Sequence, residues 1–417
     1  GGYSGSTPDN GALSPDGHTA YVTLGGATAV AVVRLAANGS AAAVAGLIPT
    51  GWYPNSVSVS RDGKMLFVVN GKSNAGPNPG GCRSNDSSER DALDKCRAQN
   101  RYILQLMRAS LLSLPVPAGT SLATLTQQVV RNNRWEDVAA SSAAADAMSA
   151  LRGKIHHVIY IIKENRSYDQ ILGDLEKGNG DPSLTVFPEP YSPNHHQLAR
   201  QFVDLDNFLV SGEVSGNGWS WSTSGRATDA LEKSVPVVYA GRGLSYDSEG
   251  NNRGINVGTA DMDARRKANP DTPDDPDLLP GTANVSAPDG PGGAAGEGFL
   301  WNSILRAGLT LRNYGFFLDL ARYNLSPTVP NFIKLVRDPH AEGLTVAFAA
   351  DPALAGVTDP YYAGFGLQLP DFWRFTEWKR EFDGYVTSGN LPSLELIRLP
   401  NDHFGNFANG TDGVNTV

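Results

Sequence analysis

Residues 156–174 read HHVIYIIKENRSYDQILGD, and this stretch decides the fold class. It contains an aliphatic run made of Val158, Ile159, Ile161 and Ile162. Such a run is typical of a strand that is covered on both faces inside a parallel sheet. The polar residues 163–166 (KENR) follow it directly. Open α/β sheets bind their ligands at the carboxyl ends of their strands. These residues are therefore a candidate site, with an ordinary solvated turn as the alternative.

Strands and helices continue to alternate further along the chain. Strand-and-turn passages are expected at 202–218 and 235–243, and a helix followed by a strand is expected both within 299–317 and within 371–403. This alternation indicates an α/β fold with a mainly parallel sheet and helices on both of its faces. We expect the α/β domain to span residues 151–417.

The composition of the whole chain narrows the class of partner. Of the 417 residues, 40% are hydrophobic and 18% are charged, and the formal net charge is -9. This acidic balance, without a cluster of lysine and arginine, argues against nucleic acid or an anionic membrane as the main partner. No apolar run reaches the roughly 18 to 20 residues that a membrane-spanning helix needs. The chain opens on GGYSGSTPDNG without a start methionine or a signal peptide, so we expect the natural N-terminus to lie outside it.

Residues 11–75 contain an internal repeat. The first copy, LSPDGHTAYVTLGGATAVAVV, begins at Leu13, and the second, VSRDGKMLFVVNGKSN, begins at Val59. Each copy reads as a strand, a tight Asp-Gly turn and a second strand, which is how a propeller blade is built.

The two copies resemble the YVTN-type propeller repeats, with YVTL at Tyr21 and FVVN at Phe67. A closed propeller normally takes 4 to 8 blades. Residues 1–150 are therefore expected to form a partial propeller of about two blades, with the other blades supplied by a partner or by the rest of the same polypeptide.

The two cysteines, Cys82 and Cys96, lie in a polar, glycine-rich and asparagine-rich loop. A disulfide between them would stabilise the loop by about 3 kcal/mol on the chain-entropy model. It would also imply an exported protein, periplasmic or extracellular. Two free thiols are the alternative, and a metal site is disfavoured because no further histidine or cysteine lies near in sequence.

Three polar clusters fall at the ends of expected strands. They are residues 163–166, the glycine-rich turn SGEVSGNGWSWSTSG around Ser215, and residues 401–403 (NDH). Ends of parallel strands meet at one edge of a sheet. A carboxylate, an amide, a serine and a histidine there would bind a hard metal and a phosphate, with backbone N–H groups of the following helix holding the anion.

Four segments in the same order resemble the bacterial phosphoesterase family of phosphatidylcholine-type phospholipases C and acid phosphatases. The segments are KENRSYDQILGD, SPNHHQLARQFVDLDNFLVSGEVS, LRNYGFF and LPNDH, and the closest resemblance is to the branch fused to a YVTN-type propeller. The resemblance implies an alkaline-phosphatase-like fold and phosphoester hydrolysis by a serine supported by a divalent metal ion (calcium, zinc or manganese). The substrate would be a small phosphoester or a lipid head group.

The resemblance also implies roles for individual residues. Ser215 matches the nucleophile, at a strand end before a helix that is expected to start near Trp221. His403 matches a second catalytic residue near the leaving group. The implied metal ligands are Glu164, Asn165, Ser215 and Asp402. The implied phosphate contacts are His195, His196 and Asn217.

Two departures from the family pattern open an alternative function. Trp219 stands where relatives of the propeller-fused branch have histidine, and tryptophan neither binds a metal nor accepts a proton. The family's further metal ligands lie downstream of the position where this sequence stops, at Val417, so we expect the C-terminal part of the domain to be missing. The alternative is a catalytically inactive structural or binding protein of an extracellular assembly that keeps the hydrolase fold.

Overall fold

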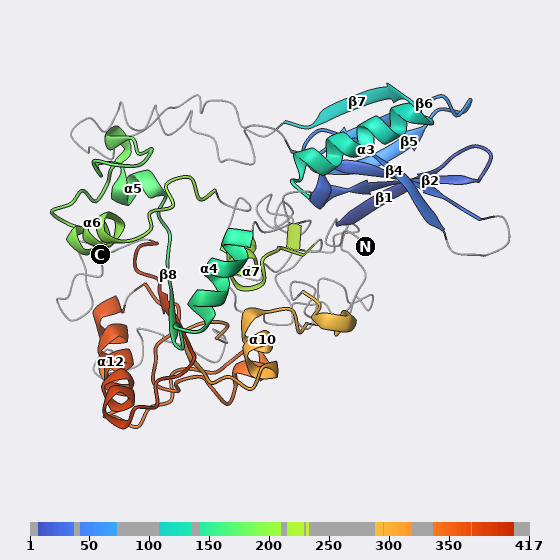
Figure 1. Cartoon of the computed structure of the whole chain (residues 1–417). Helices are drawn as coiled ribbons and strands as arrows, with labels where there is room; N and C mark the ends of the chain where they lie inside the picture. The colour runs from blue at the N-terminus through green and yellow to red at the C-terminus, as the bar shows by residue number, and fades with distance from the viewer. Residues whose placement is uncertain are drawn as a thin grey trace, which may run out of the picture. The chain divides into compact units, whose positions relative to one another are not determined.

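The computed structural model describes ten segments of the chain (Figure 1). They are residues 7–36, 42–72, 108–135, 142–209, 215–228, 231–232, 288–294, 296–318, 337–367 and 369–403. The chain divides into two compact units, Gly1–Leu151 and Arg152–Val417, and each is described by itself. The described part is mixed α/β, with two antiparallel sheets and one parallel sheet, and these sheets form no closed barrel. Within it, no helix has the length and apolar character needed to cross a membrane.

The first unit contains both antiparallel sheets. The strands of the four-stranded sheet, in spatial order, are β1 (Pro8–Leu13), β2 (Thr19–Leu24), β3 (Ala29–Arg34) and β4 (Ala43–Pro49). Those of the three-stranded sheet are β5 (Pro54–Val59), β6 (Met65–Asn70) and β7 (Ser110–Pro115). A short 3-10 helix, Gly25–Ala27, joins β2 to β3.

The predicted repeat forms two hairpins with the same turn. In β1–β2, Asp16 Oδ1 accepts hydrogen bonds from Ser14 Oγ at 2.5 Å and from the His18 backbone N–H at 3.0 Å. In β5–β6, Asp62 accepts the equivalent bond from Ser60 Oγ at 2.5 Å. The glycine after each aspartate has φ near +70° (72° and 69°), a conformation that residues with a Cβ rarely adopt. The Asp-Gly pairs therefore define both turns.

Helix α3 (Thr120–Asn132) packs against β4. Thr126 Oγ1 accepts a 2.9 Å hydrogen bond from the Leu47 N–H, and Leu122 lies beside Gly46, where a Cβ would come within 2.7 Å of it. Glycine at position 46 thus allows the close approach of helix and strand. The cysteines Cys82 and Cys96 lie outside the described residues, so their pairing stays a prediction.

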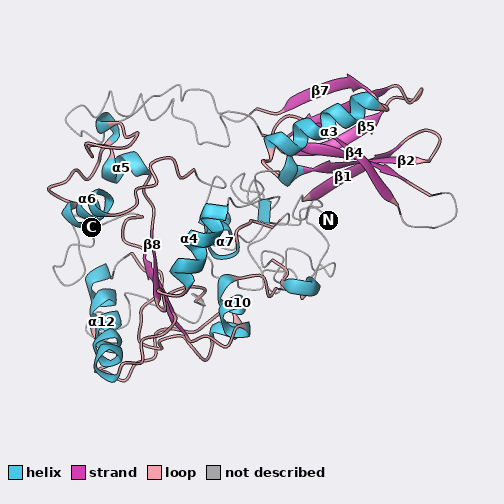
Figure 2. Cartoon of the chain, viewed as in Figure 1, coloured by secondary structure: helices cyan, strands magenta, loops and turns pink. Residues whose placement is uncertain are grey.

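The second unit is built on a three-stranded parallel sheet in the order β8-β10-β9. The strands are β8 (Val158–Lys163), β9 (Leu311–Tyr314) and β10 (Leu394–Leu399). The α-helices of this unit are α5 (Tyr168–Leu172), α6 (Pro193–Gln201), α7 (Ser215–Ser224), α10 (Leu300–Arg306) and α12 (Asp371–Ser388), and α4 (Ser142–Arg152) crosses the boundary between the units (Figure 2). Short 3-10 helices span Pro182–Leu184, Pro291–Gly293 and Pro352–Leu354.

Helices cover both faces of this sheet, as the sequence predicts. Leu394 and Leu396 of the central strand pack into a cluster with residues of α7 and α10. On the other face, Ile397 packs with Trp378 of α12, and Glu395 accepts a hydrogen bond from the Trp378 indole at 3.0 Å. Alternate residues of a strand point to opposite faces, so α12 lies on one face and α7 and α10 on the other (Figure 1).

The prediction that β8 is covered on both faces is wrong. Among the described residues β8 pairs only with β10, so it is an edge strand, and Val158, Ile159 and Ile161 are exposed. The aliphatic run correctly indicated a strand, but the neighbours of a strand depend on tertiary structure. Only Tyr160 and Ile162 pack against the core on the α7 side.

Two other expectations about elements need correction. Residues 202–209 contain no strand, and Phe202, Val203 and Phe208 are exposed there. Helix α7 begins at Ser215 rather than near Trp221. The expected strand at 235–243 lies outside the described residues.

Because β10 lies between two strands and β8 pairs with only one among the described residues, shortening a side chain should destabilise the protein more on β10 than on β8. Leu396, at the centre of β10, is fully buried, so Leu396→Ala should lower the free energy of unfolding by about 2–5 kcal/mol. Ile161 on β8 is half exposed, so Ile161→Ala should cost less than about 2 kcal/mol. Denaturant unfolding of both variants measures the difference, and equal losses would contradict the strand order.

Candidate functional site

The candidate site lies at the carboxyl edge of the parallel sheet. Leu399 of β10 pairs in register with Lys163 of β8, so both strands end at the same level. Residues 164–166 continue from β8, and residues 400–403 continue from β10. Two of the three predicted polar clusters therefore meet at one edge.

An ion pair joins the ends of these two strands. Arg398 Nη2 donates a hydrogen bond of 2.9 Å to Glu164 Oε1, and both side chains are largely buried. The Arg398 guanidinium lies over the ring of Trp219, 4.6 Å from its centroid, and over the ring of Phe365 at 4.8 Å. Cation–π contact with two rings and a carboxylate partner fixes the orientation of the guanidinium.

A second ion pair lies nearer to the solvent. Lys163 Nζ is 3.2 Å from Asp402 Oδ2, and about a third of each side chain is exposed (33% and 31%). His195 of α6 lies close enough to interact with both charges. Burial lowers the pKa of His195, the Lys163 cation lowers it further, and Asp402 opposes the shift. His195 is therefore mainly neutral at neutral pH.

His403 lies near the ion pair between Arg398 and Glu164 and interacts with both charges. Its ring meets the edge of Phe365, with the centroids 5.8 Å apart. Burial lowers the pKa of His403, the Glu164 carboxylate raises it, and the cations of Arg398 and Arg166 lower it. The outcome is a neutral imidazole at physiological pH, which is the form that accepts a proton.

Helix α7 points its N-terminus toward this edge. Tyr160, in the middle of β8, donates a 3.0 Å hydrogen bond to the carbonyl of Ser222 near the helix C-terminus. One turn earlier, Trp219 contacts Arg398, which pairs in register with Ile162 nearer the end of β8. Ser215 is the first residue of α7, one further turn toward the helix start, and it is half-buried. The free N–H groups of a helix start favour anions.

The other predicted residues of the glycine-rich turn are buried. Asn217 donates a hydrogen bond to the Glu232 carboxylate, and its Oδ1 accepts none from the described residues. Trp219 is packed edge-to-face against Phe316, with the ring centroids 4.9 Å apart. The tryptophan thus belongs to the core beneath Arg398 and does not occupy an open phosphate position.

His196 lies in a buried set of hydrogen bonds. Its Nε2 is 2.9 Å from Asp174 Oδ1, and its Nδ1 is 3.1 Å from Ser192 Oγ. The three side chains resemble a Ser-His-Asp triad. The Ser192 hydroxyl is buried, however, and donates a hydrogen bond of 2.8 Å to the carbonyl of Phe187. The ring has no exposed surface, so His196 connects α6 to the segment after α5 and does not face a ligand.

The implied metal ligands do not fit a divalent cation as they lie. Glu164 is paired with Arg398, and Asp402 is paired with Lys163, so each carboxylate already has a positively charged partner. Asn165 is exposed and follows Glu164 through a cis peptide bond. No group of three or more histidine, cysteine, aspartate or glutamate side chains within the described segments has the spacing of a metal site.

Sequence reasoning missed Arg398, which connects the predicted residues. Its signal is the single positive charge in the strand LELIRL, on the same face as Leu396. A buried charge needs a partner, and Glu164, at the end of the neighbouring strand, supplies it. Phe365 was also missed, because it comes from a loop without a recognisable pattern.

Comparisons with known proteins give no family. No family model matches the chain, and no curated protein matches it. Among solved structures, hydrazine synthase of Kuenenia stuttgartiensis matches with 26% identity and a TM-score of 0.15, covering 16% of this chain and 18% of that one. A functionally unknown protein from Desulfotomaculum acetoxidans matches with 25% identity and a TM-score of 0.15, covering 16% and 20%. The chain therefore spans only about a fifth of the length of each of these two proteins.

The two ion pairs predict separate effects on the two histidines. Glu164→Gln removes a charge that raises the pKa of His403, so this pKa should fall further. Asp402→Asn removes a charge that raises the pKa of His195, so the pKa of His195 should fall. NMR titration of the imidazole resonances measures both. Each variant serves as the control for the other, and a shift of the wrong histidine would show that the site is assembled differently.

Proposed function

We propose that the chain binds and hydrolyses a phosphoester at the carboxyl edge of the parallel sheet, with Ser215 as the nucleophile. The observation that supports this most is the direction of α7. The contacts of Ser222 with Tyr160 and of Trp219 with Arg398 support a helix start that faces the edge carrying Lys163, Arg166 and His403, and the proposal places Ser215 beside them. The proposal includes an alkaline-phosphatase-like fold for the second unit and a partial propeller for the first.

The side chains divide the chemistry among them. Lys163, Arg166 and the N–H groups at the start of α7 hold the phosphate oxygens. Ser215 Oγ attacks phosphorus, and the new O–P bond forms as the bond to the ester oxygen breaks. Neutral His403 accepts the serine proton and returns it to the leaving oxygen. Water then attacks the phosphoserine as its bond between Oγ and phosphorus breaks, and His403 takes a proton from that water and returns it to Ser215 Oγ.

The ion pairs have positioning roles in this scheme. Arg398 does not reach the solvent, so it holds Glu164 and the Trp219 side chain of α7 in place and sets the charge around His403. No step passes through a metal ion, because the two carboxylates that would bind it are engaged. A small phosphoester or a lipid head group in an exported, periplasmic or extracellular setting remains the proposed substrate and location.

A second candidate function is the binding of an oxyanion without turnover. Two observations favour it: Glu164 and Asp402 are both neutralised by cations, and Trp219 occupies the core. Such a protein would use the same edge to bind phosphate groups within an extracellular assembly.

Turnover of an aryl phosphate ester tests the enzymatic proposal. Ser215→Ala should lower kcat by about 10³-fold or more, because no other group can form the phosphoserine. Ser222→Ala on the same helix is the matched control, since its hydroxyl only donates to the Gly218 and Trp219 carbonyls. The assay is run with and without added calcium, zinc or manganese.

The outcomes separate the two candidates. Turnover that survives in Ser215→Ala would reject the serine mechanism. Absence of turnover in the wild type, together with saturable binding of inorganic phosphate by calorimetry, would favour the oxyanion-binding protein.

A further inference from the structure

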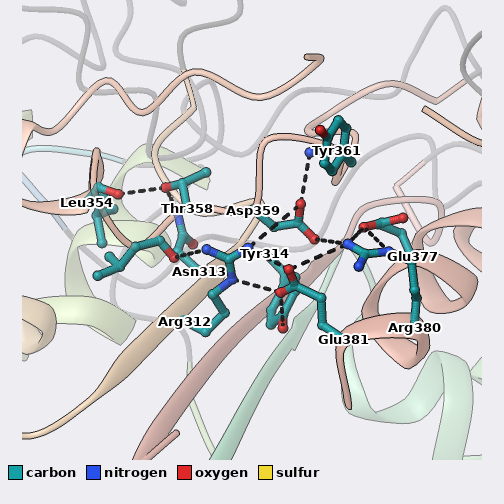
Figure 3. A network of polar contacts seen from close by, with 11 residues as sticks. Arg312, Asn313, Tyr314, Leu354, Thr358, Asp359, Tyr361, Glu377, Arg380 and Glu381 are labelled. Carbon is teal, nitrogen blue, oxygen red and sulfur yellow. Dashed lines mark hydrogen bonds and ion pairs between the residues drawn. The ribbon is translucent and has the colours of Figure 1, made fainter. Parts of the chain in front are cut away.

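A second charged cluster lies on the α12 face of the parallel sheet, opposite α7. Figure 3 shows its polar contacts. It joins three elements: β9, the segment 358–361 and the middle of α12. The charged members are Arg312, Asp359, Glu377, Arg380 and Glu381. Tyr314 adds a hydroxyl that donates to Glu381 at 2.9 Å.

The two arginines are already occupied by two of the three carboxylates. Arg312 donates through Nε and Nη2 to the two oxygens of Glu381, each at 2.7 Å. Arg380 donates through Nε to Glu377 Oε1 at 3.0 Å, and also through Nη2. Asp359 is the third carboxylate, and ionising all three would leave one uncompensated negative charge in the interior.

Asp359 is also the least satisfied member of the cluster. Its side chain is completely buried. Its Oδ1 accepts a 2.9 Å hydrogen bond from the Tyr361 N–H, but no described residue donates to its Oδ2. The nearest guanidinium nitrogens are Arg380 Nη2 at 3.8 Å and Arg312 Nη2 at 3.9 Å, too far for hydrogen bonds. The carboxylate of Glu377 is bound to Arg380 Nη2, the same nitrogen that lies nearest to Asp359 Oδ2, and it interacts with the Asp359 carboxyl.

We propose that Asp359 and Glu377 form a proton-binding site, in which one proton on Asp359 Oδ2 is donated to the Glu377 carboxylate. The proton removes the excess negative charge and gives the orphaned oxygen a partner. The site connects segment 358–361 to α12 and is independent of the proposed hydrolase function.

The charges facing Asp359 agree with a bound proton near neutral pH. Burial raises the pKa of Asp359 to about 7, the Tyr361 N–H opposes this shift, and the negative charges of Glu381 and Glu377 add to it. The groups that surround it are Arg312 and Tyr314 of β9, Glu377, Arg380 and Glu381 of α12, and, beyond Tyr314, Glu395 of β10.

The sign of the pH dependence follows from the raised pKa. The folded protein holds the proton more tightly than the unfolded chain does. The resulting stabilisation is therefore complete below the ordinary pKa of aspartate and is lost as the pH rises through about 7. Alkaline pH should thus loosen the contact between segment 358–361 and α12.

The loop that follows Asp359 reaches the candidate site. Tyr362 donates a 2.7 Å hydrogen bond to the carbonyl of Arg398, and Phe365 stacks on the Arg398 guanidinium. Arg374 of α12 holds the same loop through the carbonyls of Ala363, Gly364, Gly366 and Leu369. Release of the proton would therefore weaken one end of a loop whose other end packs behind Arg398.

Infrared spectroscopy and denaturant unfolding of the full chain test the proton site between about pH 5 and about pH 9. The wild type should lose a protonated-carboxyl band and become less stable as the pH rises through neutrality. Asp359→Asn should lack that band and show no such loss, because the amide donates to Glu377 at every pH. Asp351→Asn is the matched control, since Asp351 is a buried carboxylate with donors on both oxygens (Trp301 Nε1 and the Ala353 N–H), and it should behave like the wild type.

Each outcome decides the proposal. A neutral-pH transition in Asp359→Asn equal to that of the wild type would overturn it, as would a wild type without the band on the acidic side. If Asp359→Asn does not fold, Glu377→Gln gives the answer. The neutral side chain removes one negative charge beside Asp359 and releases Arg380 from its ion pair, so the transition should move to lower pH, and an unchanged transition would overturn the proposal.

Discussion

The ion pair between Arg398 and Glu164 is the interaction on which the second unit depends. It bridges the carboxyl ends of the edge strand β8 and the central strand β10, and the flanking Trp219 and Phe365 bring α7 and a loop to the same point. Breaking a buried pair by removing one partner typically costs about 3–5 kcal/mol, because the other charge is left buried. The candidate site exists only while this pair holds the strand ends together.

The central strand β10 separates two electrostatic environments by simple alternation. Arg398 faces α7 and contributes a positive charge to the candidate site, whereas Glu395 faces α12 and adds to a mainly acidic region. Tyr362 connects the two regions, because its ring packs against Tyr314 while its hydroxyl binds the Arg398 carbonyl. A sheet of three short strands can therefore carry two charged sites of opposite character within a few residues of each other.

Local sequence patterns predicted which elements form better than they predicted what packs around each element. The parallel sheet and the two Asp-Gly hairpins follow from periodicity and turn chemistry, which act over a few residues. The coverage of Ile161 does not, because aliphatic residues look alike in edge and central strands. The start of α7 was misplaced because Gly216 and Gly218 favour a turn locally, while packing of Trp219 in the core stabilises the helix. The contacts of Arg398 with Glu164 and of His196 with Asp174 join separate elements and form only in the tertiary structure.

The hydrogen bonds of Arg374 determine which parts of the second unit unfold locally together. Its guanidinium donates hydrogen bonds to four loop carbonyls and to the Asp371 carboxylate. The conformation of the loop is therefore held by a side chain rather than by a ladder of backbone hydrogen bonds within the loop. The loop and the first turns of α12 must then open together as one cooperative unit. Amide protons of the loop would exchange with solvent only as fast as the helix frays, although the loop has no regular secondary structure.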